Sequence, residues 1–227
     1  MSDRILVWDL PLRIFHWVLA ASFAGAFLTA ESERLRDLHV LFGYTFGGAI
    51  AFRLVWGFVG TRYARFSALR FGPAAIVRTI RSLLAGQGER HVGHGPVAVV
   101  MIPLLLGLGL VVAASGFASY AGAGGEGLEE LHEAASVVLL GVVVAHVLGV
   151  LVMSFVQREN LVLPLLSGRK PGAPGAGIRG SHRLVGLLLL AALAALWVPG
   201  LSAREAALAK QTSAVAELGG DRESQDD

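Results

Sequence analysis

Five long runs of apolar residues, separated by polar stretches, constrain this 227-residue chain more than any other feature. A helix needs about 20 consecutive apolar residues to cross the hydrocarbon core of a bilayer. Each run is close to that length, and none shows the alternation of a β-strand, so we expect membrane-spanning helices. The predicted spans cover residues 11–30, 39–59, 96–119, 129–156 and 183–200.

The composition also favours an integral membrane protein. Hydrophobic residues make up 54% of the chain and charged residues 16%, whereas about a quarter of the residues of a soluble domain are charged. The net charge is +2 and no basic patch is interleaved with aromatic residues, so nucleic acid is not an expected partner. The chain has no cysteine, which excludes disulfides, thiolate ligands and iron–sulfur clusters.

The positions of the basic residues predict how the spans are oriented. Lys and Arg of short loops concentrate on the cytoplasmic side of a membrane. Residues 60–95 and 157–182 carry several such side chains and are expected inside, whereas residues 120–128 carry none and are expected outside. Arg13 and His16 interrupt the first run, so we expect it to be retained rather than cleaved as a signal peptide. These features predict a multi-pass membrane protein with a cytoplasmic N-terminus and a C-terminus on the outer side.

Three segments lie outside a predicted four-helix core of residues 1–171. Within the core, the basic and amphipathic residues 69–85 are expected to lie on the inner leaflet, with a solvated connector as the alternative. Residues 172–182 are rich in Gly and Pro and are predicted to be a flexible linker. They lead to an appended fifth span at 183–200. Residues 201–227 are expected to form an external acidic tail, in part a short helix or else without regular structure.

Four histidines fall within the predicted spans at two depths. His39 and His132 open the second and fourth spans on the outer side, and His16 and His146 lie toward the inner side. The 14 residues from His132 to His146 correspond to a rise of about 21 Å and a return to within about 40° of the same helix face. Both side chains of the fourth span should therefore face the bundle interior, each level with one histidine of another span.

Two opposed imidazoles at one depth are suited to be the axial ligands of a six-coordinate b-type haem. An ionisable group inside the membrane is costly unless it is paired or ligated. We therefore predict two haems, one bound by His39 and His132 and the other by His16 and His146. One alternative is that the histidines form interhelical hydrogen bonds. Another is a zinc or copper site, for which acidic residues could supply further ligands only at the outer level.

Two other residues of the second span are candidate cofactor contacts. Gly43 lies four residues after His39, where the missing side chain would let a flat ring approach the helix; tight helix packing is the alternative. Arg53 follows His39 by 14 residues and so reaches the depth of the inner pair. It is a candidate partner of a haem propionate, and the alternative is an arginine that snorkels to the inner interface.

Four stretches of the chain form a recognisable set: VWDLPLRIFHW, LHVLFGYTFGGAIAFRLVWGFVGTRYARF, VGHGP and RENLVLPLLSGRK. Together they resemble the bacterial di-haem cytochrome b561 family over about residues 4–171, and within it the branch that includes the cytochrome b subunits of nickel–iron hydrogenases and cytochrome c-linked relatives. The resemblance implies haem ligands on the first, second and fourth helices, at His16, His39, His132 and His146. It also implies electron transfer between membrane quinone and a partner on the outer face.

The expected function is transmembrane electron transfer through two b-type haems, between quinone and a periplasmic redox protein. That partner would be a c-type cytochrome or a subunit of dehydrogenase or hydrogenase type, and the acidic outer loops favour a basic one. His94, Arg53 and Arg13 are the candidate quinone residues. Whether the chain is itself an enzyme stays open. The alternatives are a superoxide:quinone oxidoreductase and a non-redox membrane anchor with structural histidines, and the chain could also form a homo-oligomer.

Overall fold

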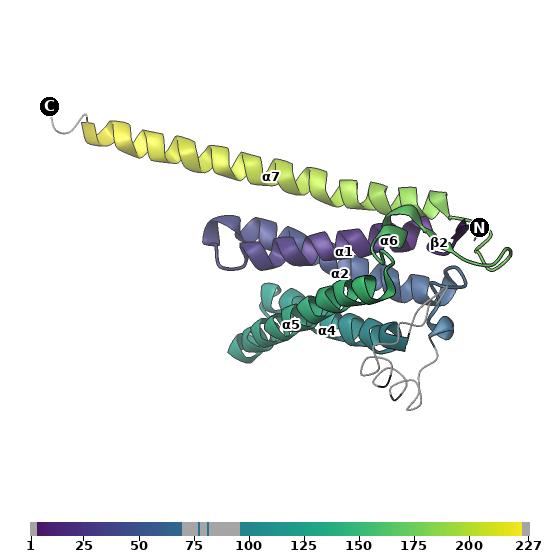
Figure 1. Cartoon of the computed structure of the whole chain (residues 1–227). Coiled ribbons are helices and arrows are strands. Elements are labelled where there is room, and N and C mark those ends of the chain that lie inside the picture. The colour runs from purple at the N-terminus through teal and green to yellow at the C-terminus, as the bar shows by residue number, and fades with distance from the viewer. Residues whose placement is uncertain (1–3, 70–76, 78–80, 82–95, 224–227) are drawn as a thin grey trace.

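The computed structural model of the chain is mostly helical (Figure 1) and describes residues 4–69, 77, 81 and 96–223. In chain order its elements are β1 (Arg4–Leu6), α1 (Leu10–Thr29), the 3₁₀ turn η1 (Glu33–Leu35), α2 (Arg36–Val59), the 3₁₀ turn η2 (Phe66–Ala68), α4 (Pro96–Tyr120), α5 (Gly125–Gln157), α6 (Leu163–Ser167), β2 (Arg169–Pro171) and α7 (Arg183–Glu223). The predicted interfacial segment 69–85 falls almost entirely outside the described residues, and so does His94.

Five helices within the described residues are long and apolar enough to cross a membrane, which confirms the predicted number of spans. These candidate spans are Leu10–Thr29, Glu33–Val59, Ala98–Tyr120, Gly125–Gln157 and Arg183–Ala207. Much of their apolar surface is not covered by protein; in α5, only Ala135 and Leu139 are buried. Lipid would cover such a surface. The chain is thus an all-α, multi-pass membrane protein.

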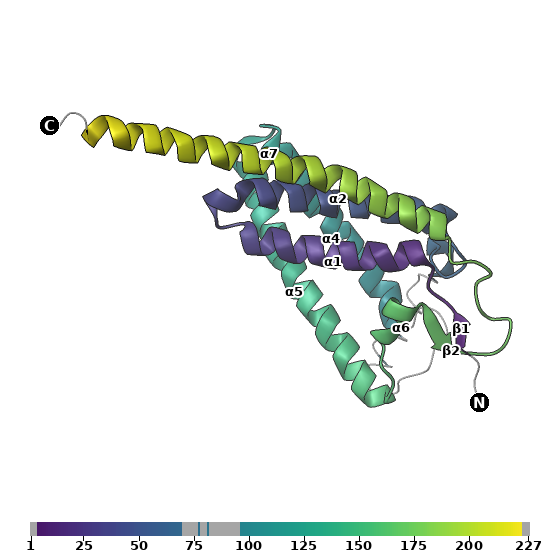
Figure 2. The ribbon, with the colours of Figure 1, turned by 90° about the horizontal axis from the view of Figure 1, so that it is seen from above.

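The helices are arranged as two pairs with α7 on one side (Figure 2). α1 packs beside α2, α4 packs beside α5, and contacts between α2 and α4 join the two pairs. α7 runs along α1 and α2, and Figures 1 and 2 both show it on the side of these helices away from α5. The four histidine candidates therefore lie on helices of the four-helix part, and α7 contributes none of them.

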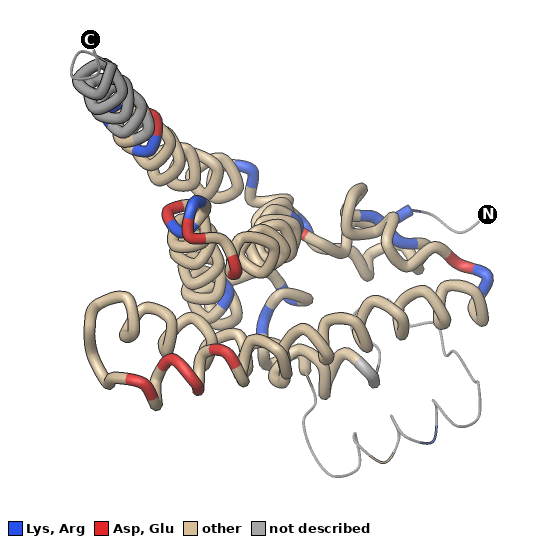
Figure 3. The backbone as a smooth tube through the Cα atoms, turned by 90° about the vertical axis from the view of Figure 1, so that its left-hand side faces the viewer, with Lys and Arg blue, Asp and Glu red and all other residues tan. Residues whose placement is uncertain are grey.

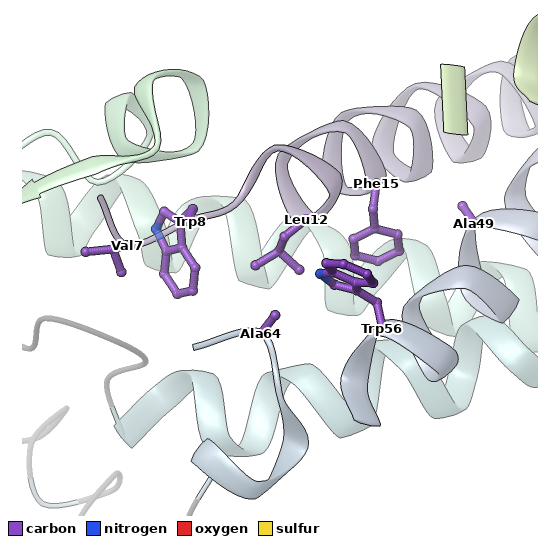
Figure 4. Close-up of a cluster of buried hydrophobic side chains, with 7 residues drawn as sticks. All are labelled: Val7, Trp8, Leu12, Phe15, Ala49, Trp56 and Ala64. Atoms are coloured by element: carbon purple, nitrogen blue, oxygen red, sulfur yellow. The ribbon is translucent and has the colours of Figure 1, made fainter. Parts of the chain in front are cut away.

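Two buried apolar clusters hold these helices together. The first lies between α1 and α2 near the N-terminus, and its members are Val7, Trp8, Leu12, Phe15, Ala49, Trp56 and Ala64 (Figure 4). The second joins α2 to α4 and α5, and its members are Phe46, Ile50, Val112, Ala135 and Leu139. The clusters thus pack α1 against α2, and α2 against α4 and α5.

The sequence Trp-Asp-Leu-Pro determines where α1 begins. The Asp9 carboxylate accepts a hydrogen bond from the Leu12 backbone N–H at 2.8 Å, which satisfies a donor that the first helical turn leaves free. Pro11 lies in that same turn, where its missing N–H breaks no helical bond. Local sequence alone therefore accounts for the start of this span.

A small cap, formed by β1, β2 and α6, covers the end of the bundle that holds the N-terminus. β1 and β2 pair as antiparallel strands with Ile5 opposite Lys170. The Arg13 guanidinium on α1 donates hydrogen bonds to the backbone carbonyls of Leu165 and Leu166 at the end of α6. The cap thus ties the start of α1 to the segment that follows α5.

Residues 172–182, which the sequence predicts to be a flexible linker, make backbone hydrogen bonds with the N-terminal part of the chain. The backbone N–H of Ile178 donates to the Leu6 carbonyl at 2.8 Å, and the Leu10 N–H donates to the Ser181 carbonyl at 3.0 Å. Gly and Pro content reports on local chain stiffness and carries no information about these distant backbone partners. The segment is a strap that follows the N-terminal chain to the start of α7.

The fifth helix does not end near residue 200, where we placed the boundary between span and tail. α7 continues as one helix to Glu223, with Pro199 inside it. Residues 203–217 are rich in Ala, which has the highest intrinsic helix propensity. The helix has 41 residues, about 60 Å at the usual rise, which exceeds the thickness of a bilayer core. Figure 1 shows its C-terminal part projecting past the other helices.

Candidate functional site

The rings of His39 and His132 face each other between α2 and α5. Their centroids are 6.3 Å apart and their planes are nearly perpendicular, at 88°. Nδ1 of His39 is bonded to the Ala26 carbonyl of α1 at 2.8 Å, and Nδ1 of His132 to the Val112 carbonyl of α4 at 3.0 Å. Because a carbonyl can only accept, both Nδ1 atoms carry the proton. Nε2 is left as the basic nitrogen of each ring.

The spacing of these two rings suits one metal ion held between them. An imidazole nitrogen lies about 2 Å from a bound metal. Two nitrogens on opposite sides of an ion are then about 4 Å apart, and the ring centroids, each about 1 Å further back, are about 6 Å apart. The observed 6.3 Å matches this separation. Hydrogen bonds from Nδ1 to backbone carbonyls are also the usual support of a metal-bound histidine.

Helix α4 carries no histidine of its own but forms a wall behind His132. Ser115 is buried, and its Oγ lies 3.3 Å from His132 Nδ1 while donating to the Val111 carbonyl at 2.8 Å. A Cβ added to Gly116 would lie 2.7 Å from His132 Cε1, so only a glycine allows the ring to lie there. Sequence reasoning missed both residues, because neither has a signal that links it to the ligand helix.

His16 on α1 and His146 on α5 form the second pair. Both side chains are half-buried, and they lie close enough to interact electrostatically. The His16 ring is edge-on to Trp17, with 5.7 Å between centroids. Since His146 follows His132 by about 21 Å of helix, the two histidine pairs lie at different levels of the bundle.

An apolar layer separates the two levels. Phe46 lies seven residues after His39 and Leu139 seven residues after His132, and both are buried in the same cluster. Seven residues are about two helical turns, so these side chains lie midway between the levels. The layer separates the two levels by buried apolar side chains.

Arg53 is the most buried basic residue of the described chain, with 3% of its surface exposed. Its guanidinium lies over the Phe66 ring, 4.6 Å from the centroid, and interacts with the charge of Asp9. Its Nη1 has no hydrogen-bond partner within the described structure. An unpaired buried N–H is costly, so this nitrogen suits an anionic group that the described residues do not supply.

Asp9 is a further residue that sequence reasoning missed. It is completely buried, and beyond capping α1 it accepts hydrogen bonds from Trp56 Nε1 at 3.1 Å and from Thr61 Oγ1 at 2.6 Å. The Asp-x-Pro pattern before an apolar run is an N-cap signal that could have identified the helix start. No sequence pattern indicates its contacts with Trp56 and Thr61 at the far end of α2.

The other candidates from the sequence lie in different surroundings. A Cβ added to Gly43 would meet no atom within 4 Å, so the surface of α2 is open there. Arg13 lies in the cap, where it donates to α6 carbonyls. In the same cap, burial lowers the pKa of Lys170, and the nearby Glu159 carboxylate offsets part of that effect. His94 lies outside the described residues.

The two ends of the bundle differ in charge (Figure 3). Exposed carboxylates gather on the first turns of α5, at the level of His132; they are Glu126, Glu129, Glu130 and Glu133. The turn between α1 and α2 adds residues of both signs. At the opposite end, Arg62, Arg65, Arg158 and Arg169 are exposed. The His39–His132 pair thus lies nearer an acidic surface and the His16–His146 pair nearer a basic one.

No group of three or more His, Asp or Glu side chains in the described part of the chain is arranged to hold a metal ion. Structural zinc usually takes four protein ligands and catalytic zinc three. Paired histidines without a third ligand suit a cofactor that occupies the remaining metal positions itself, as a porphyrin does. The alternative of a zinc or copper site therefore has no support from these residues.

Comparison with known families gives one match. A family model described as prokaryotic cytochrome b561 matches residues 7–168, which is more than half of the chain. The match includes all four candidate ligands and ends before the strap and α7. Searches of curated proteins and of solved structures each gave no significant match.

Proposed function

This chain belongs to the prokaryotic cytochrome b561 family, and we propose that it conducts electrons across the bacterial inner membrane through two b-type haems. Members of this family bind b-type haem, so the general function is transmembrane electron transfer. The finer proposal is a path between membrane quinone at one side and a periplasmic redox protein at the other. That protein would be a c-type cytochrome or a subunit of dehydrogenase or hydrogenase type.

The observation that carries the proposal is the geometry of His39 and His132. Their rings are spaced for one ion, and each Nδ1 is bound to a carbonyl of a neighbouring helix. A histidine that served only to join helices would gain nothing from a second imidazole facing it at this distance. The spacing therefore supports axial ligation by this pair more strongly than a structural role.

Each candidate cofactor-binding residue has a defined role in this proposal. His39 and His132 would hold the haem nearer the periplasm, and His16 and His146 the haem nearer the cytoplasm. Haem, when bound, supplies a reversible one-electron couple of its iron. Arg53 would donate Nη1–H to a propionate carboxylate, a charge-assisted bond that satisfies its free nitrogen. Gly43 leaves room for the ring beside α2.

We place the quinone at the cytoplasmic end, beside the His16–His146 pair. Oxidation of a quinol releases protons, so its site needs hydrogen-bonding or titratable groups near a haem. His94 and Arg53 are the leading candidates, and for Arg53 this role is the alternative to pairing with a propionate. Arg13 is a weaker one, because its guanidinium already donates to two carbonyls of α6.

We place the redox partner at the opposite end, on the acidic surface near His132. The exposed carboxylates at the start of α5 favour a positively charged protein by electrostatic complementarity. They disfavour an anionic substrate such as superoxide, which a cationic entrance would attract. This charge pattern is why electron transfer to a protein is preferred over superoxide oxidation.

Single replacements of the four histidines by alanine test the proposal. Each should reduce the haem content by about half, because one axial ligand of one haem is lost while the other site keeps both. A pyridine haemochrome assay on the purified protein measures this content. His182→Ala is the matched control, since His182 is exposed at the start of α7 and should leave both haems in place.

Two results would contradict the proposal. Full haem content after any one of the four replacements would remove that histidine from the ligand set. A wild-type protein without reducible b-type bands in its visible spectrum would instead favour a membrane anchor with structural histidines.

A further inference from the structure

Asp9 and Arg53 are the buried charged residues of the described chain, with exposed fractions of 0% and 3%. The proposed function uses Arg53 but gives no role to Asp9. We infer that Asp9 is a positioning residue: its fixed negative charge offsets the charge of the Arg53 guanidinium at the level of the His16–His146 pair, and so keeps Arg53 from raising the redox potential of the haem bound there. The inference rests on the proposed function, because it needs a haem at that pair.

Hydrogen bonds from three elements fix the Asp9 carboxylate in place. Oδ1 accepts from the Leu12 N–H at the start of α1, and Oδ2 accepts from Trp56 on α2 and from Thr61 in the loop after α2. The side chain is thus unable to turn away from α2 without breaking several bonds. Its charge acts on Arg53 from a constant position.

Arg53 lies at the level of His16. It shares one face of α2 with Ala49 and Trp56, which are four residues before it and three after it. Both neighbours pack in the cluster that contains Phe15 of α1, the residue immediately before His16 (Figure 4). Asp9 and Arg53 therefore lie at the level of the candidate ligand of α1.

Because Asp9 and Arg53 are buried, their charges should affect the redox potential of a haem at this level. Charges interact more strongly in a low-dielectric interior than in water. Together Asp9 and Arg53 are nearly neutral, so their combined effect on the haem is small. If one charge is removed, the other is left uncompensated. A free positive charge favours the reduced haem and raises its potential, whereas a free negative charge lowers it.

The decisive experiment is a redox titration of the haem-loaded protein carrying Asp9→Asn. Asparagine has nearly the same shape and is as good an N-cap as aspartate, so it keeps the bond from Leu12 through its remaining oxygen. It removes the charge together with the Oδ2 acceptor of Trp56 and Thr61. We expect two haems per chain, a higher potential for one haem and an unchanged potential for the other. Arg53→Gln should lower the potential of that same haem.

The double variant Asp9→Asn/Arg53→Gln provides the internal check. Removing both charges should bring the potential back toward the wild-type value, which two independent structural defects would not do. Asp37→Asn is the matched control, because Asp37 is an exposed aspartate in the first turn of α2 at the other end of the bundle. It should leave the potential of the affected haem unchanged.

The outcomes separate the inference from the proposed function. A wild-type haem content below two per chain overturns the proposed function and this inference with it. Two haems and unchanged potentials in Asp9→Asn, or equal shifts of both haems, overturn the inference alone. If Asp9→Asn does not accumulate, recovery of haem and potential in the double variant supports the charge pair. If the double variant also loses haem, only the hydrogen bonds of Asp9 matter, and the inference is overturned.

Discussion

At the residue scale, the orientation of the His39 and His132 rings comes from helices that supply neither ring. His39 is bonded to a carbonyl of α1, and His132 to a carbonyl of α4. These bonds select the Nδ1-protonated form, which leaves Nε2 as the basic nitrogen of each ring. Gly116 completes the arrangement, since its missing side chain is what lets His132 lie against α4.

Gly116→Ala should therefore damage the haem site at His39 and His132. The added methyl group would lie 2.7 Å from His132 Cε1, and overpacking of this kind typically costs about 1–3 kcal/mol. We expect partial loss of one haem and a changed spectrum of what remains, measured by haemochrome assay and reduced-minus-oxidised spectra. Gly107→Ala on the same helix is the control, because its Cβ would meet no atom within 4 Å. Wild-type haem content and spectrum in Gly116→Ala would show that the ring has room to move.

At the scale of single helices, α7 stands apart because it supports two ligand helices without supplying a ligand. Trp197 donates from Nε1 to Thr45 Oγ1 of α2 at 2.9 Å and packs edge-on against Phe42, 4.9 Å between centroids. Near its other end, a Cβ on Gly186 would lie 2.9 Å from Leu10 of α1. These contacts stabilise the position of α7 on the outside of the α1–α2 pair.

Removal of α7 should consequently leave the haem sites intact and reduce stability. A chain that stops after Pro171 should insert and bind both haems, but denature at a lower temperature. A chain that stops after His182 keeps the backbone bond between Leu10 and Ser181 and should be the more stable of the two. The Trp197 hydrogen bond itself accounts for about 0.6 kcal/mol, the average for such bonds in membranes. Loss of both haems from a well-expressed truncated chain would make α7 part of the core.

At the scale of the whole molecule, the charge difference between the two ends predicts orientation in the membrane. Basic side chains gather at the end that holds the cap, and acidic ones at the start of α5 (Figure 3). The positive-inside rule then places the cap in the cytoplasm and the α4–α5 turn in the periplasm. This arrangement would bring quinone chemistry and the redox partner to opposite sides.

Labelling of single cysteines tests this orientation cleanly, because the natural chain has no cysteine. Ala123→Cys, in the exposed turn between α4 and α5, should react with a membrane-impermeant maleimide in intact spheroplasts. Ser67→Cys, exposed after α2, should react only after lysis. The cysteine-free chain controls for background. The reverse pattern would exchange the membrane sides to which we assign the quinone and the redox partner.

The sequence by itself determined the number of spans and the levels of the histidines. Both depend on two constants, the thickness of the hydrocarbon core and the rise of a helix, so the spacing of His132 and His146 was enough to place them. The spacing of 14 residues from His39 likewise predicted Arg53 at the level of His16, and the structure shows Arg53 buried. For the residues it describes, the structure agrees with the predicted spans except at the end of α7.

Only the tertiary structure decided which side chains and carbonyls surround these levels. Asp9 meets Trp56 and Thr61 across 47 and 52 residues of sequence, and the strap meets the N-terminal chain by backbone bonds alone. Such contacts depend on how far each helix is rotated and shifted against its neighbours. In a membrane, periodicity does not specify that rotation, because lipid-facing and protein-facing residues are both apolar, and close packing of small residues decides it instead.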